Sequence, residues 1–327
     1  MTDRTISIAT IDASRDRVYR VARRTPLVKL DPVSRGLPEI YLKLEIFQPI
    51  GSFKIRGAAN AVGRLTPAEL RDGVWTVSAG NAAQGVSLAA REAGVPASVL
   101  VMDTAPAAKI NAIKRLGARI VQAPYDTCWR AVETHASDLM TGRMVHPFDD
   151  DDFISGNGTV GLEILDELPD VDAVVAAVGG GGLLAGLGCV MRARKTSARV
   201  IAAEPETAAP LAASFAANAP QYFGGWTPSF VDGAGGKSVL ETMWPLMREW
   251  VDESVVVSLD DTAAAMKLAA ERCHVIAEGA GACAIAAALS ETVRGRGYKK
   301  VVAVVSGGNI DLSRFASIVG ACGDRSL

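Results

Sequence analysis

The 327-residue chain has little of what marks several classes of protein. Its 34 Lys and Arg residues nearly balance 36 Asp and Glu residues without a basic block, so the sequence predicts no nucleic-acid partner. Five cysteines occur without CxxC spacing, which favours packed thiols in a reducing compartment over a disulfide framework. The three histidines, His135, His146 and His274, lack metal-ligand spacing and are assigned to packing or to the surface.

Long hydrophobic runs are also scarce. The first 25 residues carry charges throughout, so we expect no signal peptide and a cytoplasmic location. Residues 171–191 contain a single charge over about one membrane thickness. Their centre is GGGG, which would interrupt a spanning helix, and the flanking residues predict a strand, a loop and a helix. We therefore expect no contact with a membrane.

The rest of the chain alternates between strand and helix patterns. Strands are predicted at residues 40–45, 74–78, 97–101, 119–122, 173–178, 200–203 and 300–305. Helices are predicted at residues 83–93, 107–116, 126–140, 159–168, 183–194, 260–274 and 281–292, with Asp260 as a helix cap. This alternation is typical of an α/β protein with parallel strands covered on both faces, and the length favours two domains.

One lysine stands where an extended segment turns into a helix, in the stretch QPIGSFKIRGAAN at residues 48–60. A lysine amine holds an aldehyde cofactor as a reversible imine when its ammonium is partly desolvated, and Lys54 has this opportunity beside Phe53. The aromatic ring of Phe53 is suited to pack against a flat cofactor. Taken alone, however, a solvated lysine at a helix start is the more common situation.

Four successive glycines follow the predicted strand at residues 173–178, namely Gly179, Gly180, Gly181 and Gly182. Free backbone N–H groups and the helix dipole make such a turn an anion site. A dinucleotide site is an alternative, because Gly180, Gly182 and Ala185 satisfy GxGxxG/A and Glu204 ends the next strand. The glycines alone leave both interpretations open.

Two further loops follow predicted strands, where open α/β sheets bind ligands. The first is SAGNAAQG at residues 78–85, whose amides suit a substrate carboxylate and whose Asn81 can donate to a phenolate oxygen. A capped helix start explains this loop equally well. The second is SGGN at residues 306–309, where Ser306 can meet a ring nitrogen or cap the helix expected near Asp311.

Taken together, SFKIRG, SAGNxAQG, GGGGL and VSGGNID resemble the fold type II pyridoxal-phosphate enzymes, and within them the threonine/serine dehydratases and serine racemases. The resemblance runs from TPL at residues 25–27 through HPFDD at 146–150 to the final SGGN. It displaces the dinucleotide interpretation, which predicts neither Lys54 nor SGGN. It implies two open, twisted, mostly parallel sheets flanked by helices. A smaller domain of residues 50–142 would be inserted into a larger cofactor-binding domain of residues 1–49 and 143–327.

The resemblance also implies roles for individual residues. Lys54 would hold pyridoxal 5'-phosphate and later move the Cα proton of the substrate. Phe53 would lie against the cofactor ring, Asn81 would bond its phenolic oxygen, the glycines at 179–182 would hold its phosphate, and Ser306 would face its pyridine nitrogen. The implied activity is that of an ammonia-lyase, which converts a 3-hydroxy amino acid such as L-threonine or L-serine to a 2-oxo acid and ammonia. A homodimer of a short form without a regulatory domain is implied as well.

Three residues near the expected substrate loop depart from the family pattern. Ala79 stands where racemases of the family usually carry serine, so we expect little racemisation. Ala82 replaces a usual histidine, and Asn157 replaces the glutamine of GQGT. With Ser78 and Asn81, these residues are expected to contact the substrate, and they leave open a bulkier or acidic 3-hydroxy amino acid. A serine racemase-like isomerase, a β-replacement enzyme and a non-catalytic cofactor- or amino-acid-binding protein remain alternatives.

The acidic residues give weaker signals. Glu204 keeps the acidic start of AEP and is a weak metal candidate, but Pro210 occupies the position of a second acidic ligand, so we expect no metal site. Glu278, in AEGAG, is expected to support the site. The acidic run at residues 149–152 is interpreted as a solvated turn.

Overall fold

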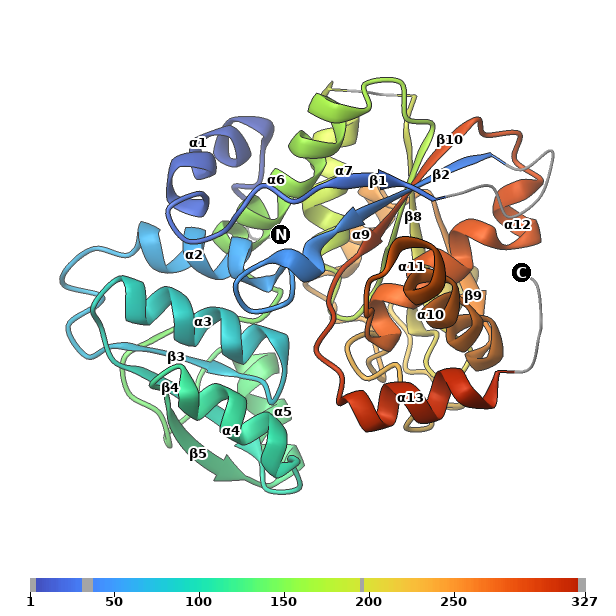
Figure 1. The fold of residues 1–327 in the computed structure, drawn as a ribbon. Coiled ribbons are helices and arrows are strands. Elements are labelled where there is room, and N and C mark those ends of the chain that lie inside the picture. Colours follow the sequence, from blue (N-terminus) through green and yellow to red (C-terminus); the bar gives the residue numbers. More distant parts are fainter. Residues whose placement is uncertain (1–3, 31–37, 195–196, 323–327) are drawn as a thin grey trace. The chain divides into compact units, whose positions relative to one another are not determined.

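The computed structural model describes residues 4–30, 38–194 and 197–322. The chain forms two compact units, each with its own sheet (Figure 1). Unit 1 comprises Met1–Arg23 and Gln48–Thr159, and unit 2 comprises Arg24–Phe47 and Val160–Leu327. The domain boundaries predicted at residues 50 and 142 stay a prediction. Parts of the predicted larger domain, residues 1–3, 31–37, 195–196 and 323–327, lie outside the described residues.

The sheet of unit 1 has the strand order β5-β4-β3-β6 and is parallel throughout. Its strands are β3 (Val74–Val77), β4 (Ala97–Met102), β5 (Arg119–Ala123) and β6 (Arg143–Met144). The helices of this unit are α1 (Ile8–Val18), α2 (Lys54–Arg64), α3 (Asn81–Glu92), α4 (Ala107–Arg115) and α5 (Tyr125–Thr134). Helix α6 (Asp151–Glu167) begins in unit 1 and ends in unit 2.

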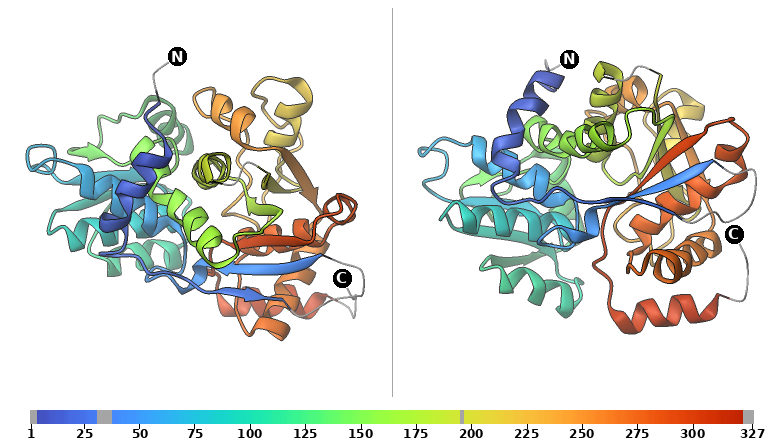
Figure 2. Two further views of the ribbon diagram at one scale, coloured as in Figure 1. Left: turned by 90° about the horizontal axis from the view of Figure 1, so that it is seen from above. Right: turned by 45° about the horizontal axis from the view of Figure 1, so that its top comes forward.

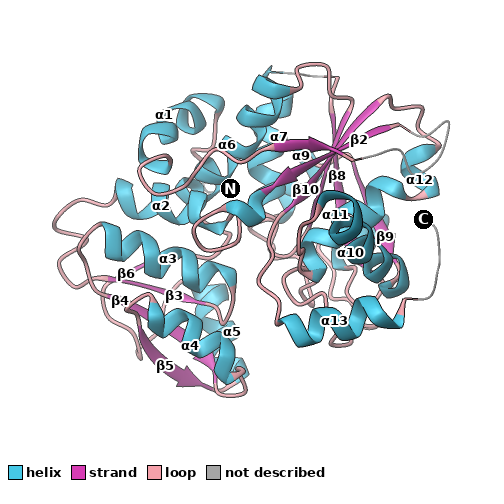
Figure 3. Ribbon diagram, in the orientation of Figure 1, coloured by secondary structure: helices cyan, strands magenta, loops and turns pink. Residues whose placement is uncertain are grey.

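The winding of this sheet reverses once. The chain proceeds from β3 to β4 to β5 with α3 and α4 on one face, and then returns past β3 to β6 with α5 on the other face (Figure 3). Right-handed crossover connections require this change of face. The reversal lies between β3 and β6, where open α/β sheets bind ligands at the carboxyl ends of the strands. The loops at residues 78–81 and 145–150 follow these two strands.

The sheet of unit 2 has the order β1-β2-β10-β7-β8-β9 and is parallel except for β1, which pairs antiparallel with β2. Its strands are β1 (Leu27–Lys29), β2 (Glu39–Leu44), β7 (Ala173–Ala177), β8 (Arg199–Pro205), β9 (Glu253–Val257) and β10 (Lys300–Val305). The helices are α7 (Gly182–Arg194), α8 (Pro210–Ala217), α9 (Trp244–Trp250), α10 (Leu259–Cys273), α11 (Gly279–Leu289), α12 (Glu291–Arg294), α13 (Leu312–Ala321) and the 3₁₀ helix η1 (Glu45–Phe47).

This sheet reverses between β7 and β10. Helices α7 and α9 cover one face, and α10 and α11 cover the other (Figure 2). The glycine loop after β7 and the SGGN loop after β10 therefore follow neighbouring strands at the second reversal. Burial holds this arrangement together, because every residue of α11 is buried and the small side chains of GAGACAIAAAL let the helix approach the strands closely.

The predicted fold class is confirmed: two mostly parallel sheets are flanked by helices. Several details differ from the predictions. The helix predicted at 126–140 ends at Thr134, because His135 adopts a left-handed conformation with φ 55°. The helix predicted at 159–168 begins at Asp151, although its first turns contain glycines with low helix propensity. Ser258, not Asp260, caps α10 by accepting the amide of Asp261 at 3.0 Å.

No helix in the described ranges is long and apolar enough to cross a membrane. This agrees with the interpretation of residues 171–191 as a strand, a loop and a helix, since they contain β7 and the start of α7.

Candidate active site

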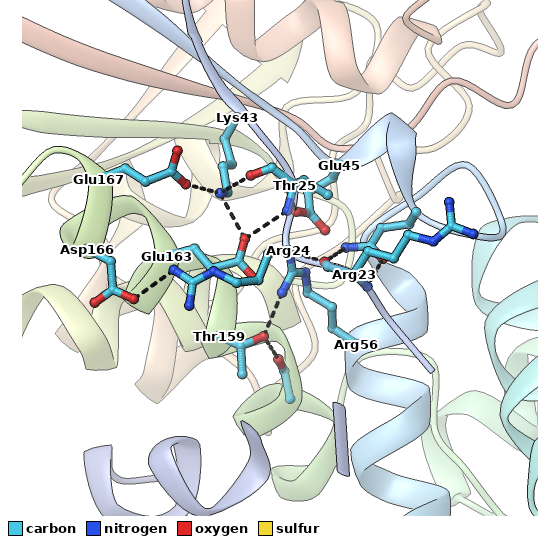
Figure 4. A network of polar contacts seen from close by, with 12 residues as sticks. Arg23, Arg24, Thr25, Lys43, Glu45, Arg56, Thr159, Glu163, Asp166 and Glu167 are labelled. Atoms are coloured by element: carbon cyan, nitrogen blue, oxygen red, sulfur yellow. Dashed lines mark hydrogen bonds and ion pairs between the residues drawn. The ribbon is translucent and has the colours of Figure 1, made fainter. Parts of the chain in front are cut away.

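Lys54 is the first residue of α2, directly after the N-cap residue Phe53. The backbone of Lys54 is close to α3, since a Cβ added to Gly85 would lie 3.0 Å from the carbonyl oxygen of Lys54. The glycine that ends SAGNAAQG therefore allows α3 to pack against the first turn of α2. Arg56, fully buried two residues further along, donates to Thr159 Oγ1 at 3.1 Å and to the carbonyl of Arg23 at 3.2 Å (Figure 4).

The ammonium of Lys54 is held in apolar surroundings. Its Nζ donates to the carbonyl oxygen of Pro147 at 2.6 Å and lies 5.2 Å from the ring centre of Phe53 and 5.4 Å from that of Phe153. Burial lowers the pKa of Lys54 from 10.5 to about 8. About a tenth of this amine is therefore uncharged at pH 7, which supplies the form that a nucleophile or a base requires.

The turn that presents Pro147 is built around His146, which is 2% exposed. The Nδ1 atom of His146 accepts the amide of Asp149 at 2.7 Å and that of Phe148 at 3.3 Å, while Nε2 lies 3.1 Å from the carbonyl oxygen of Val132. Burial lowers the pKa of His146 to about 3. This histidine is therefore neutral and carries its proton on Nε2.

The acidic run at residues 149–152 is not the solvated turn that the sequence predicts. Asp149 is 3% exposed and accepts from Arg4 at 2.8 Å. Asp150 caps α6 by accepting the amide of Phe153 at 2.8 Å, and burial raises its pKa. These carboxylates fix the end of the turn and the start of α6.

The loop after β3 begins α3 without a side-chain cap. The hydroxyl of Ser78 accepts the amide of Gly80 at 3.0 Å, which shapes the turn, and the half-buried Asn81 follows as the first helical residue. Ala79 packs against the core of unit 1, and Ala82 is 4% exposed. Asn157 is fully buried on α6.

In unit 2, the glycine loop has a conformation that other residues avoid. Gly181 has φ +90°, and a Cβ there would lie 2.8 Å from Met247 Sδ. A Cβ at Gly179 would lie 3.4 Å from the carbonyl oxygen of Gly233, and the amide of Gly235 donates to the carbonyl of Val178 at 3.0 Å. The loop at residues 233–235 therefore supports the glycine loop.

Ser306 and Glu278 lie close to each other in the same unit. The amide of Glu278 donates to the carbonyl of Gly307 at 3.0 Å, and a Cβ on Gly233 would lie 3.3 Å from Glu278 Oε1. Ser306 is 5% exposed and is the first residue after β10. The structure therefore brings the glycine loop, Glu278 and Ser306 together at the reversal between β7 and β10.

The carboxylate of Glu204 binds the start of helix α8. This fully buried carboxylate accepts the amides of Leu211 at 2.8 Å and Ala212 at 2.7 Å and the hydroxyl of Ser254 at 2.6 Å. Burial raises its pKa. It thus caps α8, which Pro210 begins. In the described part of the chain, no group of three or more potential His, Cys, Asp or Glu ligands is found.

The residue pattern predicts no role for the Pro147 carbonyl, for Phe153 or for the hydrogen bonds of His146. The motif HPFDD could have indicated the hydrogen bonds of His146, because a histidine just before a turn is able to accept the backbone N–H groups that follow it. A backbone carbonyl, by contrast, leaves no trace in residue type.

In both sheets the strand order reverses once, and loops follow the carboxyl ends of the strands at each reversal, where open α/β sheets bind ligands. A model of the family described as pyridoxal-phosphate dependent enzyme matches residues 18–307. The chain belongs to this family and is a pyridoxal-phosphate-dependent enzyme.

Similar proteins are found among curated sequences and solved structures. The chain is 38% identical over 320 residues to the L-threonine ammonia-lyase of Thermotoga maritima, covering 96% of this chain and 78% of the relative. It is 36% identical over 321 residues to a catabolic L-threonine dehydratase of Staphylococcus aureus, covering 96% and 92% of the two chains. The structure of maize serine racemase matches with a TM-score of 0.89 and 32% identity, covering 95% of this chain and 96% of that one.

The residues present fit this cofactor. Lys54 supplies an amine whose pKa burial lowers to about 8. Gly181 has φ +90° and no Cβ, so the glycine loop allows a phosphate to approach its backbone closely. Ser306 supplies a buried hydroxyl directly after β10, beside the glycine loop.

Proposed function

We propose that the protein is an ammonia-lyase for a small 3-hydroxy amino acid such as L-threonine or L-serine. The amino acid would lose its β-hydroxyl as water, and the resulting enamine would take up water and release a 2-oxo acid and ammonia. The observation that carries the proposal is the desolvated Lys54, whose pKa of about 8 suits both attachment and proton transfer. Two relatives that are 38% and 36% identical carry the names threonine ammonia-lyase and threonine dehydratase.

Lys54 is the proposed catalytic residue. Its amine would bind the aldehyde of the cofactor and, once displaced by the substrate, would take the Cα proton of the substrate. Bound pyridoxal phosphate supplies the electron sink that acidifies this proton. The carbonyl of Pro147 accepts from the ammonium at 2.6 Å and so receives the lysine in its protonated state.

Other residues are proposed to hold the cofactor. Phe53 would lie against its ring, Asn81 would donate to its phenolic oxygen, the glycines at 179–182 would bind its phosphate, and Ser306 would face its pyridine nitrogen. Glu278 would support this arrangement, because its amide donates to the carbonyl of Gly307 and its carboxylate lies beside Gly233. A hydroxyl opposite the ring nitrogen does not enforce a charged pyridinium as a carboxylate would, and this favours prompt loss of a β-leaving group over slower alternatives.

Ser78, Ala79, Asn81, Ala82 and Asn157 are proposed to shape the substrate site. The uncapped amides of α3 suit a substrate carboxylate. Because Ala82 and Asn157 are buried, we expect them to set the shape of the wall more than to bond the substrate. A bulkier or acidic 3-hydroxy amino acid therefore stays an alternative substrate.

A racemase-like isomerase is the second candidate, because maize serine racemase is 32% identical. Ala79 argues against it, since a methyl group carries no proton for the opposite face. Purified enzyme supplied with L-serine should therefore form the 2-oxo acid much faster than it forms D-serine. Comparable rates would favour the isomerase.

The decisive experiment compares Lys54→Ala with Lys114→Ala, an exposed lysine on α4. Cofactor-loaded protein and the Lys114 variant should show the visible absorbance of bound cofactor and release 2-oxo acid and ammonia from a panel of 3-hydroxy amino acids. The Lys54 variant should show neither. Persistence of both in Lys54→Ala would refute the proposed role.

The remaining proposals concern context. The five cysteines are free thiols, which supports a cytoplasmic location. A homodimer is supported by the family resemblance, and sedimentation of the purified chain tests it. We further propose that residues 50–142 form the smaller domain and that no divalent cation is required, since Glu204 already caps α8.

A further inference from the structure

The surroundings of Pro147 point to a residue that acts on Lys54 from a distance. The Pro147 carbonyl and the Phe148 N–H belong to one peptide group, and all peptide bonds in the described residues are trans. In a planar trans peptide, the C=O and N–H point in opposite directions. The N–H is directed at His146 Nδ1 at 3.3 Å, and the C=O is directed at Lys54 Nζ at 2.6 Å.

The histidine is itself held in one orientation. A carbonyl only accepts, so the contact of Nε2 with Val132 O at 3.1 Å places the proton on Nε2 and leaves Nδ1 as the acceptor. The ring of His135 stacks on that of His146 at 4.3 Å between centres, and Phe148 meets its edge at 4.6 Å. The carboxylate of Asp149 lies 3.3 Å from His135 Nε2 and accepts from Arg4 at 2.8 Å.

We propose that His146 is a positioning residue: by accepting the Phe148 N–H at Nδ1, it orients the peptide group whose carbonyl receives the Lys54 ammonium. The orientation of the buried imidazole thus fixes the direction of the Pro147 carbonyl, and this carbonyl in turn fixes the position of the Lys54 ammonium. Proline at position 147 reinforces this, because its ring restricts φ and it has no N–H to compete for Nδ1. The inference rests on the proposed role of Lys54 for its functional meaning, but not for its geometry.

The expected effect is a change in the acidity of Lys54. A hydrogen bond to the ammonium favours the charged form and so raises the pKa against the effect of burial. If the carbonyl turns away, the pKa of Lys54 should fall by about one unit, since hydrogen bonds to charged groups are worth about one pKa unit or more. At pH 7 the amine would then react about fivefold faster with an acylating reagent.

Two substitutions distinguish the role of Nδ1 of His146 from that of Nε2. In His146→Asn, the amide oxygen takes the place of Nδ1, so the Lys54 pKa should stay near the wild-type value. In His146→Gln, the side chain reaches toward Val132 but lacks the acceptor near the turn, so the pKa should fall. His274→Asn, which changes a histidine of left-handed conformation at the end of α10, is the control and should leave Lys54 unchanged.

The measurement is the pH dependence of acylation of each lysine in the full-length, cofactor-free chain, quantified by mass spectrometry, with circular dichroism to verify folding. A Lys54 pKa that is unchanged in both His146 variants, or that falls equally in both, overturns the proposal. If the variants do not fold, nitrogen NMR of wild-type protein replaces them. His146 should then show an unprotonated Nδ1 down to pH 5, and a protonated Nδ1 at that pH contradicts the proposal.

These outcomes are independent of the proposed function. Failure of the cofactor-loaded wild-type protein to release 2-oxo acid from the substrate panel would refute the proposed reaction while leaving the pKa comparison valid. Conversely, an unchanged Lys54 pKa in the His146 variants would refute the positioning role and leave the ammonia-lyase proposal standing.

Discussion

Replacing Lys43 by methionine should destabilise unit 2 strongly. Lys43 and Glu163 are both fully buried, and their charged atoms lie 2.8 Å apart (Figure 4). The ammonium also donates to Glu167 at 2.9 Å and to the carbonyl of Thr25 at 2.6 Å. Methionine fills a similar volume, but it leaves the Glu163 charge buried without its cation.

The magnitude follows from that uncompensated charge. Removing one partner of a buried ion pair costs about 3–5 kcal/mol, whereas neutralising both partners costs far less. For a unit of this size, such a loss corresponds to a Tm lowered by about 6–20 °C. Adding Glu163→Gln should recover at least half of the loss, because glutamine is neutral and still accepts the Thr25 amide, now bonded at 3.2 Å.

Thermal unfolding followed by circular dichroism measures these effects for the two single variants and the double variant. Lys29→Met is the matched control, since Lys29 lies on the adjacent strand β1 and pairs with Glu39 at the surface. It should leave the Tm within error. A Tm for Lys43→Met that matches this control, or a double variant as unstable as the sum of its single variants, would show that the buried charge is not the cause.

Three further predictions follow from single sites. Cofactor uptake by cofactor-free protein should speed up as pH rises, with a midpoint at about 8, because Lys54 is a protonated, unreactive ammonium below its pKa; a midpoint near 10 would contradict the burial of its ammonium. Gly181→Ala should weaken cofactor affinity about tenfold or more by absorbance titration, since L residues at positive φ cost about 1–2 kcal/mol. Gly297→Ala, strained at φ +73° with nothing within 4 Å, should keep the affinity. Thr76→Val should stabilise unit 1 by about 1 kcal/mol in urea unfolding, because the buried Thr76 hydroxyl has no partner among the described residues; a lower midpoint would contradict this.

Much of the fold could be predicted from the residues because buried parallel strands leave a strong pattern. The strand predicted at 300–305 coincides with β10, where β-branched residues are buried on both faces. The beginning of α6 was predicted too late, because Gly156 and Gly158 lower the helix propensity there. Tertiary packing explains them: a Cβ at Gly156 would lie 2.4 Å from the carbonyl oxygen of Arg56. Such a contact is invisible in one segment read alone.

Capping shows the same limit on a smaller scale. Ser258 and Asp260 are both suitable N-cap residues, and the pattern of α10 does not distinguish them. In the structure, the hydroxyl of Ser258 accepts the Asp261 amide at 3.0 Å, so the helix begins one residue before the predicted cap. The strand β9 and the short helices α8 and α9 were not predicted, since each has fewer than ten residues and weak periodicity.

The parts of the candidate site that depend on side-chain chemistry could be predicted from the sequence. The parts that depend on the order of the strands in each sheet could not. The glycine loop and Ser306 follow β7 and β10, which are far apart in sequence and become neighbours only through long-range pairing. In unit 1 the corresponding neighbour of β3 is β6, a strand of two residues that no periodicity reveals. That short strand brings the turn containing His146 and Pro147 beside the loop that follows β3. The contact of the Pro147 carbonyl with Lys54 therefore depends on a strand pairing of only two residues. For this reason the sequence predicts the reactive lysine but not the carbonyl oxygen that accepts a hydrogen bond from its ammonium.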